Sequence, residues 1–391
     1  MTKNVFIVGS RGIPAKYGGF ETFAQELVEN RESTEIKYFV ASQRKNSTPI
    51  IEEPTFEYHG ATVFQIDVGE FGPTTPIMYD IKSILWVIKY VKKHSIQGSI
   101  IYILGNTIGP LLQFFVPTFR KLDIQVFVNP DGLEWKRAKW IKPIRTYLKV
   151  AESSMVKTAD LIVSDNPGIE DYLRKVYVDV DFTSKYIAYG VKKPKVGSDS
   201  LHRKRLDWLQ LHNISENDYY LVVGRFIPEN NYETILKEFI RSNTNKKLVI
   251  ITRPEGKFFN DLKNKTDFER DPRIIFAGTV YDPELLSSIR TYAYAYIHGH
   301  SVGGTNPSLL EALSTTKLNL LYDVNFNHYV GQDSSLYWTL QDFSLAHLIE
   351  TADKLNSDQI NEYHHLAQKR VETEYDWKKI SQQYETLFLE R

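Results

Sequence analysis

Arg225 and a glycine-rich segment near residue 303 carry the residue types that bind a diphosphate. Arg225 follows Gly224 directly after the apolar run Tyr219–Val223. A guanidinium at the end of a strand can make paired, charge-assisted hydrogen bonds to phosphate oxygens. The alternative for such a residue is a surface salt bridge. The position after a strand favours the phosphate role, and Arg253, which follows the next apolar strand, is a second candidate cation.

The segment His298–Ala312 leads from another apolar run into a helix pattern. Backbone N–H groups at such a point form an anion cradle. The residues predicted to form it are Gly303, Gly304, Thr305 and Asn306. The two histidines His298 and His300 could bind a metal ion, but no carboxylate lies close to them in sequence. We therefore expect no metal and no other cofactor, with Arg225 and the helix start stabilising a leaving diphosphate.

Glu311 lies in the predicted helix that follows this cradle. Its neighbours Leu309, Leu310, Ala312 and Leu313 are apolar, so we expect a buried setting in which an unpaired carboxylate would be costly. A carboxylate can accept hydrogen bonds from vicinal ribose hydroxyls. The pattern favours a nucleoside as the partner of Glu311 over an ordinary charged helix position.

The first half of the chain opens with a second glycine-rich turn, Gly9–Glu21, between a strand and a helix pattern. Its glycines, including Gly18 and Gly19, allow a close approach to a ligand, and Arg11 and Lys16 add positive charge. The alternative is a plain turn with surface charges. A nicotinamide site is disfavoured because the glycine spacing is different and no acidic residue follows the second strand.

Two further segments of the first half could meet an acceptor or a membrane. Asp131, after the strand at 125–128, could bind an acceptor hydroxyl or act as a base, and Glu134 is a weaker candidate. The alternative for Asp131 is a helix N-cap. The tract 135–149 mixes lysine and arginine with tryptophan, which is typical of interfacial membrane contact but also of a solvated helix face. The helix pattern Met78–Lys93, with Trp86 and Tyr90, is a second membrane candidate.

Alternating strand and helix patterns must position these residues. Apolar runs are predicted as strands at 5–8, 36–41, 100–104, 125–128, 161–163, 219–223, 248–252, 274–277, 293–297 and 318–322. Such alternation predicts parallel sheets covered on both faces, so the fold class is α/β with two doubly wound Rossmann-like domains. We place a first domain at 1–190, a linker at 191–200, a second domain with the predicted diphosphate-binding residues at 201–375 and a closing helix at 376–391. In such sheets ligands bind beyond the carboxyl ends of strands, here in a cleft between the domains.

Composition excludes several classes of protein. The 391 residues contain 48 lysines and arginines and 48 aspartates and glutamates, which argues against a nucleic-acid partner. There is no cysteine, so disulfides and thiol nucleophiles are excluded. The sequence starts directly with a strand pattern and has no apolar run long enough to span a membrane. We expect a cytoplasmic protein, soluble or peripheral on the membrane.

The motifs together resemble glycosyltransferase family 4, whose members are retaining enzymes of the GT-B fold. The opening GSRGIPAKYGGFETF is similar to the N-terminal domain of bacterial β-1,4-rhamnosyltransferases of capsule or cell-wall synthesis. The resemblance implies dTDP-rhamnose as the donor and glucose or N-acetylglucosamine on a polyprenyl diphosphate as the acceptor. It also implies a place on the inner face of the plasma membrane and a C-terminal helix that packs back on the N-terminal domain.

Carried over by position, the resemblance implies that Arg225 binds phosphate and that Glu311 is the second glutamate of the E-x7-E pattern. Gly18 and Gly19 match the loop that contacts donor phosphate or acceptor, and Asp131 lies near the reacting centre. Arg11, Lys16, Tyr17 and Glu134 complete the predicted acceptor side. Two positions depart from the family pattern. Asn230 stands where a lysine is usual, and Gly303 stands where the first glutamate is usual.

The sequence thus predicts a hexosyltransferase whose catalytic residues are Asp131, Arg225 and Glu311. A transferase with another nucleotide-sugar donor and a nucleotide-sugar epimerase of the same build remain alternatives. Outside enzymology, the alternative is a sugar-nucleotide-binding scaffold with a dead site. The oligomeric state is not predicted.

Overall fold

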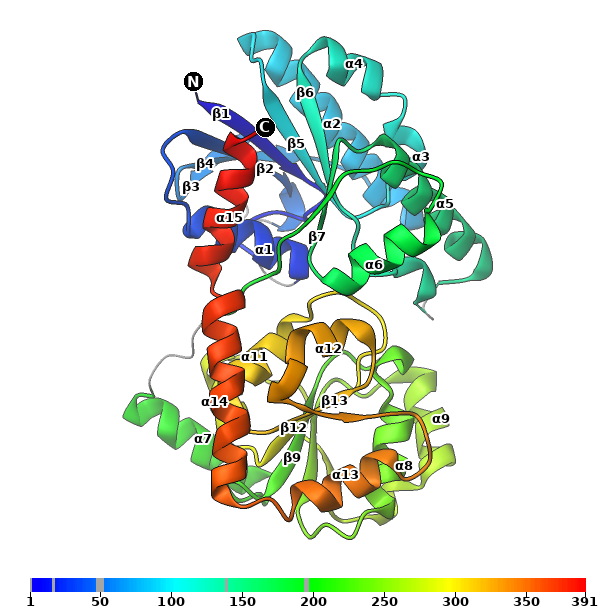
Figure 1. Ribbon diagram of the computed structural model, residues 1–391, viewed down its shortest axis with the longest axis vertical. Helices are drawn as coiled ribbons and strands as arrows, with labels where there is room; N and C mark the ends of the chain where they lie inside the picture. The colour runs from blue at the N-terminus through cyan, green and yellow to red at the C-terminus, as the bar shows by residue number, and fades with distance from the viewer. Residues whose placement is uncertain (1, 16–17, 47–52, 138–139, 193–196) are drawn as a thin grey trace. The chain divides into compact units, whose positions relative to one another are not determined.

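The computed structural model of the chain describes residues 2–15, 18–46, 53–137, 140–192 and 197–391 (Figure 1). Contacts divide it into two compact units. Unit 1 comprises residues 1–190 and 377–391, and unit 2 comprises residues 191–376. Each unit contains one sheet with helices packed against it, so each can be described by itself.

Unit 1 is built on an eight-stranded sheet of order β3-β4-β2-β1-β5-β6-β7-β8. Its strands are β1 (Lys3–Val8), β2 (Ile36–Gln43), β3 (Thr55–Tyr58), β4 (Ala61–Ile66), β5 (Ser99–Leu104), β6 (Ile124–Asn129), β7 (Leu161–Ser164) and β8 (Ser184–Tyr186). Only the β3–β4 pair is antiparallel among the described strands. The central strands β1 and β5 are buried along most of their length, as expected for parallel strands covered on both faces.

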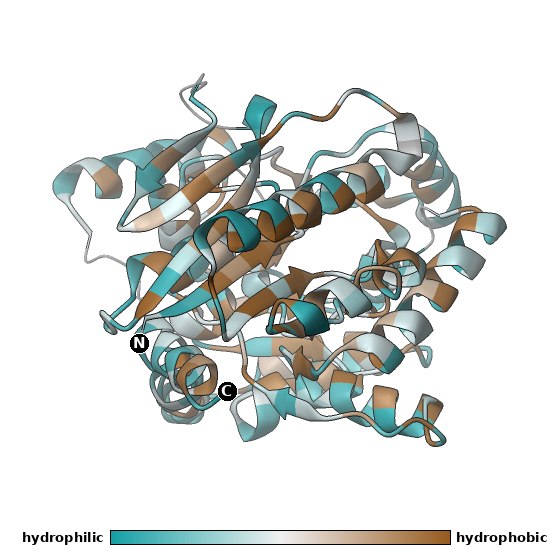
Figure 2. Cartoon of the chain, turned by 90° about the horizontal axis from the view of Figure 1, so that it is seen from above, coloured by the Kyte–Doolittle hydropathy of each residue, from teal (hydrophilic) through white to brown (hydrophobic). Residues whose placement is uncertain are grey.

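Helices cover both faces of this sheet because alternate strand residues point to opposite sides. They are α1 (Gly19–Glu29), α2 (Thr75–His94), α3 (Gly109–Leu112), α4 (Val116–Lys121), α5 (Lys142–Thr158) and α6 (Pro167–Val176), with short 3-10 turns η1 (Arg44–Asn46), η2 (Gly72–Thr74) and η3 (Glu134–Lys136). Phe6 stacks on Phe39 at 4.6 Å on the α2 side. Figure 2 shows the hydropathy of the chain: the strands are largely hydrophobic, and the helices carry hydrophobic and hydrophilic residues on different sides.

The last helix, α15 (Trp377–Leu389), packs on the opposite face of the same sheet. It contacts α1, β1 and β2. The Tyr384 hydroxyl lies 3.1 Å from that of Tyr102 on β5, and the Phe388 ring packs near Tyr38 on β2. The apolar residues that share one face of this helix, Trp377, Ile380, Tyr384 and Leu387, are buried. The C-terminal helix therefore belongs to the core of the N-terminal domain, as the family resemblance implies.

Unit 2 is built on a six-stranded parallel sheet of order β11-β10-β9-β12-β13-β14. Its strands are β9 (Tyr219–Val223), β10 (Lys247–Ile251), β11 (Ile274–Phe276), β12 (Ala295–His298), β13 (Asn319–Tyr322) and β14 (Leu336–Trp338). Its helices are α7 (Asp199–Leu211), α8 (Tyr232–Arg241), α9 (Gly256–Thr266), α10 (Pro283–Thr291), α11 (Pro307–Thr315), α12 (Asn325–Gly331), α13 (Ser344–Ala352) and α14 (Ser357–Glu374), with 3-10 turns η4 (Pro228–Asn230), η5 (Phe268–Arg270) and η6 (Gln332–Ser334). β9 and β12 are neighbours at the centre of the sheet, which brings the two predicted phosphate-binding loops to the same edge.

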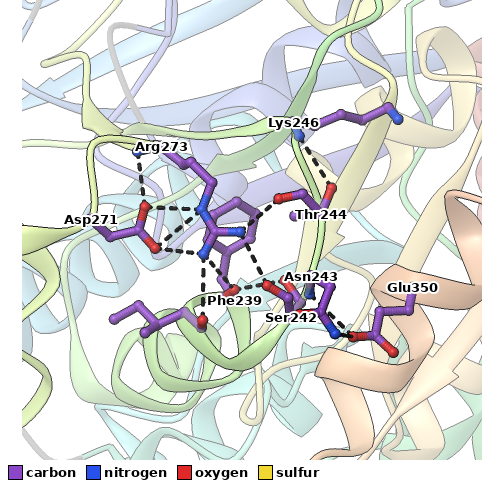
Figure 3. A network of polar contacts seen from close by, with 9 residues as sticks. Phe239, Ser242, Asn243, Thr244, Lys246, Asp271, Arg273 and Glu350 are labelled. Atoms are coloured by element: carbon purple, nitrogen blue, oxygen red, sulfur yellow. Dashed lines mark hydrogen bonds and ion pairs between the residues drawn. The ribbon is translucent and has the colours of Figure 1, made fainter.

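Arg273 directly precedes β11 and binds the carbonyl groups that follow α8 (Figure 3). Its guanidinium donates to the carbonyls of Ser242 and Thr244 at 3.1 and 2.6 Å, where the helix has run out of its own donors. Asp271 binds the same guanidinium at 2.6 Å, and this ion pair lowers the pKa of the Asp271 carboxyl. This network holds the amino end of unit 2's sheet, away from the loops that follow β9 and β12.

The expected α/β class and all ten predicted strands are confirmed, with ends that differ by one or two residues. The sequence prediction missed the short strands β8 and β14 and the pair β3 and β4. β3 and β4 are joined by the two-residue turn His59-Gly60 with positive φ at both residues. On α2 the buried face includes Val87, whereas Leu85 is 51% exposed. Part of the predicted linker lies outside the described residues, and α7 already begins at Asp199 within it.

Candidate functional site

The loop after β9 carries the Arg225 guanidinium at the surface. Hydrogen bonds from Asn230 and Tyr232 hold the backbone of this loop. Arg225 is exposed, as the sequence prediction requires. Asn230 is buried and donates from Nδ2 to the Arg225 carbonyl at 2.7 Å. The Tyr232 hydroxyl donates to the Gly224 carbonyl at 3.2 Å. Asn230 thus shapes the loop that carries Arg225, a neutral role that a charged lysine could not fill in the same buried place.

The loop after β12 touches the Arg225 loop directly. A Cβ atom placed on Gly299 would lie 2.2 Å from the Asn230 carbonyl oxygen, and one on Gly224 would lie 3.2 Å from the His300 ring. The Ser301 N–H and hydroxyl both donate to the Glu229 carbonyl, at 2.9 and 2.8 Å. The two predicted phosphate-binding loops therefore form one continuous surface at the carboxyl ends of β9 and β12.

His298 and His300 stack face to face within this surface. Their ring centroids are 4.2 Å apart with an angle of 9° between the planes. His298 is fully buried. Burial, and to a smaller extent the charge of the neighbouring His300, lowers the pKa of the His298 imidazole well below its ordinary value. The His298 ring is therefore neutral at physiological pH. Two ligands of one metal ion must point toward a common position. The stacked, parallel rings of His298 and His300 do not.

The start of α11 offers fewer free donors than the sequence predicts. Asn306 is its N-cap and accepts from the Ser308 N–H through its side chain at 2.9 Å. The N–H groups of Leu309 and Leu310 are directed at the Asn306 carbonyl, at 3.0 and 3.1 Å. An anion at this end of the helix must be held by the loop 303–306. Gly303 has φ +146° and open space where a side chain would be, so a ligand can approach its backbone.

Glu311 has a partner within the protein, contrary to the expectation that a ligand must supply one. Its Oε2 atom lies 2.7 Å from Nη2 of Arg290, at the end of α10. The Glu311 side chain is 47% exposed, whereas that of Arg290 is 4% exposed. The neighbours Leu309, Leu310, Ala312 and Leu313 are buried as predicted. The desolvation argument for a ligand partner is therefore wrong, and the nucleoside role of Glu311 remains a prediction supported by its exposed side.

Arg253, the other predicted cation, is held less firmly than Arg225. It follows β10 and pairs with Glu255, with 2.9 Å between Nε and Oε2. The two side chains are 74% and 65% exposed. An ion pair at such exposure contributes about 0–1 kcal/mol, so the Arg253 side chain can exchange its partner readily.

The glycine-rich turn of unit 1 is filled by the protein's own atoms. A Cβ on Gly9, whose φ is +94°, would lie 2.2 Å from the Leu104 carbonyl oxygen. A Cβ on Gly18 would lie 1.8 Å from Oε2 of Glu21. The other carboxylate oxygen of Glu21 accepts from the Arg11 N–H at 2.7 Å. The predicted phosphate contact at Gly18 does not fit this geometry, because a buried carboxylate already occupies the anion position.

The remaining predicted residues of this turn have different surroundings. The Arg11 side chain is exposed, and Gly19 begins α1 with open space on its surface side. Both remain available to a ligand. Lys16 and Tyr17 lie outside the described residues.

Asp131 sits in a tight turn at the carboxyl end of β6. Its backbone has φ +54°, its N–H donates to Oδ1 of Asn129 at 3.0 Å, and its own Oδ1 accepts from the Gly132 N–H at 2.7 Å. Asp131 is not a helix N-cap, because η3 is capped by Leu133. The half-buried carboxylate stands at the sheet edge where the acceptor prediction places it.

Glu134 organises its own loop. Its carboxylate pairs with Nε of Arg137 and accepts from Nε1 of Trp140 at 2.9 Å. Because both oxygens bind neighbours in the chain, the predicted contact with an acceptor would require this loop to rearrange.

Much of the predicted basic and aromatic membrane tract is likewise engaged internally. Lys149 lies 4.6 Å from the Trp135 ring centroid and 3.0 Å from the Glu152 carboxylate, and Arg145 donates to the Trp135 carbonyl at 3.1 Å. Lys139 lies outside the described residues. In the second tract, Trp86 stacks on Phe64 at 3.9 Å, so its ring packs against the sheet rather than facing a membrane.

Asp80 is a buried acidic residue near the carboxyl end of β5 that the sequence analysis did not single out. It is 3% exposed and accepts from the Thr107 hydroxyl at 2.7 Å, at the edge where β5 ends. Burial raises the pKa of the Asp80 carboxyl to about 7. The available signal was its spacing: Asp80 shares the buried face of α2 with Ile84, Val87 and Val91, where an acidic residue is unexpected.

A hollow of about 910 Å³ lies beside α12 in unit 2, away from the predicted residues. His328 and Tyr337 line it with rings stacked at 3.9 Å, and Asp323 binds the His328 ring at 2.7 Å. Asn327 on the same helix donates to the His300 carbonyl at 3.0 Å, which connects α12 to the site loop.

In residues 2–15, 18–46, 53–137, 140–192 and 197–391, no three histidine or acidic side chains are grouped as metal ligands. Within the same ranges, no helix has the length and apolar character to cross a bilayer.

A family model matches the first half of the chain. Residues 2–192 match the family described as "Domain of unknown function (DUF1972)". The search of curated proteins returned no match.

Among solved structures, sucrose-phosphate synthase from Thermosynechococcus elongatus is similar with a TM-score of 0.75 at 14% identity, covering 100% of this chain and 99% of that one. Anabaena HepE in complex with UDP gives a TM-score of 0.72 at 14% identity and covers 100% of both chains. A glycosyltransferase from Rickettsia africae gives 0.71 at 11% identity, covering 100% of this chain and 98% of that one. The chain therefore has the GT-B fold, with two Rossmann-like domains and a C-terminal helix that returns to the first.

Proposed function

We propose that the protein is a retaining hexosyltransferase that transfers L-rhamnose from dTDP-rhamnose to a glucose or N-acetylglucosamine acceptor on a polyprenyl diphosphate. The GT-B fold supports the transferase class, and HepE, a similar structure, binds UDP and the nucleotide sugar UDP-glucose. The rhamnosyl donor and the lipid acceptor rest on the resemblance of the opening sequence to rhamnosyltransferases.

One observation carries the proposal. The exposed Arg225 guanidinium stands on a loop that Asn230 holds, and this loop meets the 298–306 loop at the carboxyl ends of β9 and β12. A guanidinium and a glycine-containing loop on one surface match the donors that a diphosphate requires. No bound cation is needed in this proposal, because Arg225 and the loop supply the positive field that a leaving diphosphate requires.

The chemical step follows from this placement. The bond between the anomeric carbon of the sugar and the diphosphate oxygen breaks as the acceptor hydroxyl oxygen bonds to the same face of that carbon. The hydroxyl proton passes to the leaving diphosphate. In unit 1, Asp131 and Asp80 lie at the sheet edge that we assign to the acceptor, and Asp131 is the residue that we propose to bind the attacking hydroxyl.

Membrane association is proposed from exposed apolar side chains near the α3–α5 contact. Phe114 is 71% exposed, Ile141 65% and Val150 53%, and lysines on α5 lie close by in sequence. Apolar side chains beside lysines suit an anionic bilayer surface. This arrangement supports a peripheral position on the inner face of the plasma membrane. Binding to vesicles that contain anionic lipid, lost in the triple substitution of these residues to serine, is the test.

The activity is tested by incubating the purified protein with a panel of nucleotide sugars and synthetic polyprenyl-diphosphate acceptors, in EDTA and in Mg²⁺, with products identified by mass spectrometry. We expect a rhamnosylated lipid from dTDP-rhamnose in both buffers. Transfer from another donor would correct the sugar, and conversion of the donor without an acceptor would establish an epimerase. Tight nucleotide binding without any product would establish a binding scaffold.

A further inference from the structure

The hollow beside α12 is lined by side chains that are all polar or aromatic. Its volume of about 910 Å³ is within the usual range of ligand sites. Four of the described residues around it are aromatic, namely His328, Tyr329, Tyr337 and Tyr363. The others carry an amide, a carboxylate or a hydroxyl, and none of the described lining residues is a lysine, an arginine or an aliphatic residue.

This composition selects among classes of ligand. A phosphate or carboxylate would need cations to bind it, and the described lining offers the acid Asp333 instead. A lipid chain would leave the polar atoms of the lining without partners. A neutral carbohydrate suits both conditions, because its C–H faces pack on aromatic rings and its hydroxyls both donate and accept hydrogen bonds.

Two of the aromatic rings form a fixed platform. The ring centroids of His328 and Tyr337 are 3.9 Å apart, with 10° between the planes. Nε2 of His328 lies 2.7 Å from Oδ1 of Asp323, and the Tyr337 hydroxyl donates to the Gln332 carbonyl at 2.8 Å. The His328 side chain is still 49% exposed, so its ring can also meet a ligand. Two rings stacked on each other cannot both face a small organic cation, as an aromatic cage requires.

Gln332 stands at the edge of the hollow in an unfavourable backbone conformation. Its φ is +43° and its ψ is −135°, a combination that residues other than glycine rarely adopt. Its Oε1 accepts from Nη1 of Arg370 at 2.7 Å, which leaves the amide N–H groups as donors. Arg370 also donates to the carbonyls of Tyr329 and Val330, both at 2.7 Å, and so holds the end of α12. Strained residues that their surroundings hold in this way cluster at binding sites.

We propose that this hollow is a second binding site of the protein and that its ligand is a neutral oligosaccharide. One sugar ring packs on His328, while sugar hydroxyls accept from the Gln332 amide and donate to the Asp333 carboxylate. The inference goes beyond the proposed function, because no residue of this site belongs to the loops 224–231 and 298–306 that we assign to the donor. In a transferase, such a site holds a glycan through sugars other than the one that reacts.

The test is isothermal titration of the full-length protein, without nucleotide, with cellotetraose and chitotetraose. These are neutral chains of glucose and of N-acetylglucosamine. We expect binding of at least one of them, weakened by about fivefold or more in His328→Ala because the ring platform is lost. His347→Ala removes another exposed histidine of unit 2, stacked on Phe343 away from the hollow, and should leave the affinity unchanged.

A second variant separates binding from folding. Gln332→Gly removes the amide donors and places glycine where φ is positive. It should weaken oligosaccharide binding by about threefold or more without lowering the midpoint of thermal unfolding, because the backbone is relieved of strain. A residue that only supported the fold would not show this combination. Unchanged affinity in both Gln332→Gly and His328→Ala would place the oligosaccharide elsewhere and overturn the inference.

The same titrations with tetramethylammonium and with inorganic phosphate test the excluded classes. Binding of either ion that is lost in His328→Ala, with no binding of the oligosaccharides, would overturn the carbohydrate assignment. A protein that binds none of these probes would overturn the site itself. Neither result touches the proposed transferase, whose product assay uses nucleotide sugars and the loops after β9 and β12.

Discussion

Two glycine-rich loops, one in each unit, read alike in the sequence and differ in the structure. In the turn 9–21 of unit 1, the protein's own atoms take the space that glycine leaves, and Glu21 supplies the anion. In the loops around Arg225 and Gly303 of unit 2, the guanidinium is exposed and the space beside Gly303 is open. Glycine and cations therefore mark a phosphate site only where the chain has not already supplied the negative charge.

The largest effect expected from this comparison is on stability in unit 1. Gly9→Ala should lower the free energy of unfolding by about 3 kcal/mol, because the new Cβ overlaps the Leu104 carbonyl at a positive φ. Gly19→Ala in the same motif meets no atom within 4 Å and lies in α1, so it should be neutral or slightly stabilising. Urea denaturation of both variants measures the difference, and equal losses would show that the turn is not packed as described.

Arg225→Ala should lower kcat/KM for the donor by about 100-fold, equivalent to about 2.7 kcal/mol of lost stabilisation of the leaving diphosphate. Arg253→Ala is the matched control, since it removes an exposed guanidinium from the neighbouring strand end. It should cost less than about fivefold because Arg253 is 74% exposed and already has Glu255 as partner. Steady-state kinetics with both variants distinguishes the two cations, and a greater loss for Arg253→Ala would reverse their roles.

An effect that depends on pH is expected at Asp80, which also belongs to unit 1. Its folded-state pKa of about 7 lies above the ordinary value of 3.8, so the folded protein retains a proton that the unfolded chain has lost between these values. The contribution of Asp80 to stability therefore falls as pH rises from about 4 to about 7, and the destabilisation is complete above pH 7. Asp80→Asn should stabilise the protein by up to about 4 kcal/mol more at pH 8 than at pH 4, because the gap between 3.8 and about 7 is worth about that much.

Thermal or urea unfolding at both pH values checks the Asp80 prediction. Asp80→Asn keeps the hydrogen bond from Thr107 to an amide oxygen, so a gain at high pH reports the loss of the buried charge. A variant that is equally destabilised at both pH values would mean that the carboxylate is ionised and needed in the fold. Such a result would also remove a contrast between the units. Asp80 in unit 1 would then be charged, as is Glu311 in unit 2, which is paired with the Arg290 guanidinium.

The smallest effect is expected at Asn230. Asn230→Ala removes the hydrogen bond to the Arg225 carbonyl and should cost about 1 kcal/mol of stability. It should also raise KM for the donor severalfold, because the loop that carries the guanidinium is no longer held. Asn243→Ala, which removes a surface hydrogen bond to Glu350, is a control that should leave KM unchanged. An unchanged KM in Asn230→Ala would show that the loop is held by its other contacts.

The sheets could be predicted from the sequence because runs such as Ile100–Leu104 are apolar throughout, and only burial on both faces explains that pattern. The β3–β4 hairpin was missed because His59-Gly60 is not one of the common Asn-Gly or Asp-Gly turns and because Thr55–Tyr58 is short. The placement of Arg225 and the 303–306 loop at the carboxyl ends of strands could also be predicted, and β9 and β12 are indeed neighbours, while the binding roles of these residues remain predictions.

The contacts that decide individual roles could not be read from the chain. Arg290 and Glu311 are 21 residues apart and belong to different helices, so their pairing depends on how α10 packs against α11. Glu21 enters the glycine turn only because the backbone at Gly18 adopts φ +127°. Local patterns predict elements and their ends, whereas the partner of a charged side chain is set by tertiary packing.

Hydrogen–deuterium exchange with and without dTDP, in EDTA, tests most directly where the nucleotide binds. We predict that dTDP slows exchange in the segments 224–231 and 299–311 and leaves 9–21 unchanged, with the same pattern when Mg²⁺ replaces EDTA. Protection that appears at 9–21 instead, or that requires Mg²⁺, would contradict a diphosphate held by Arg225 and the loop before α11.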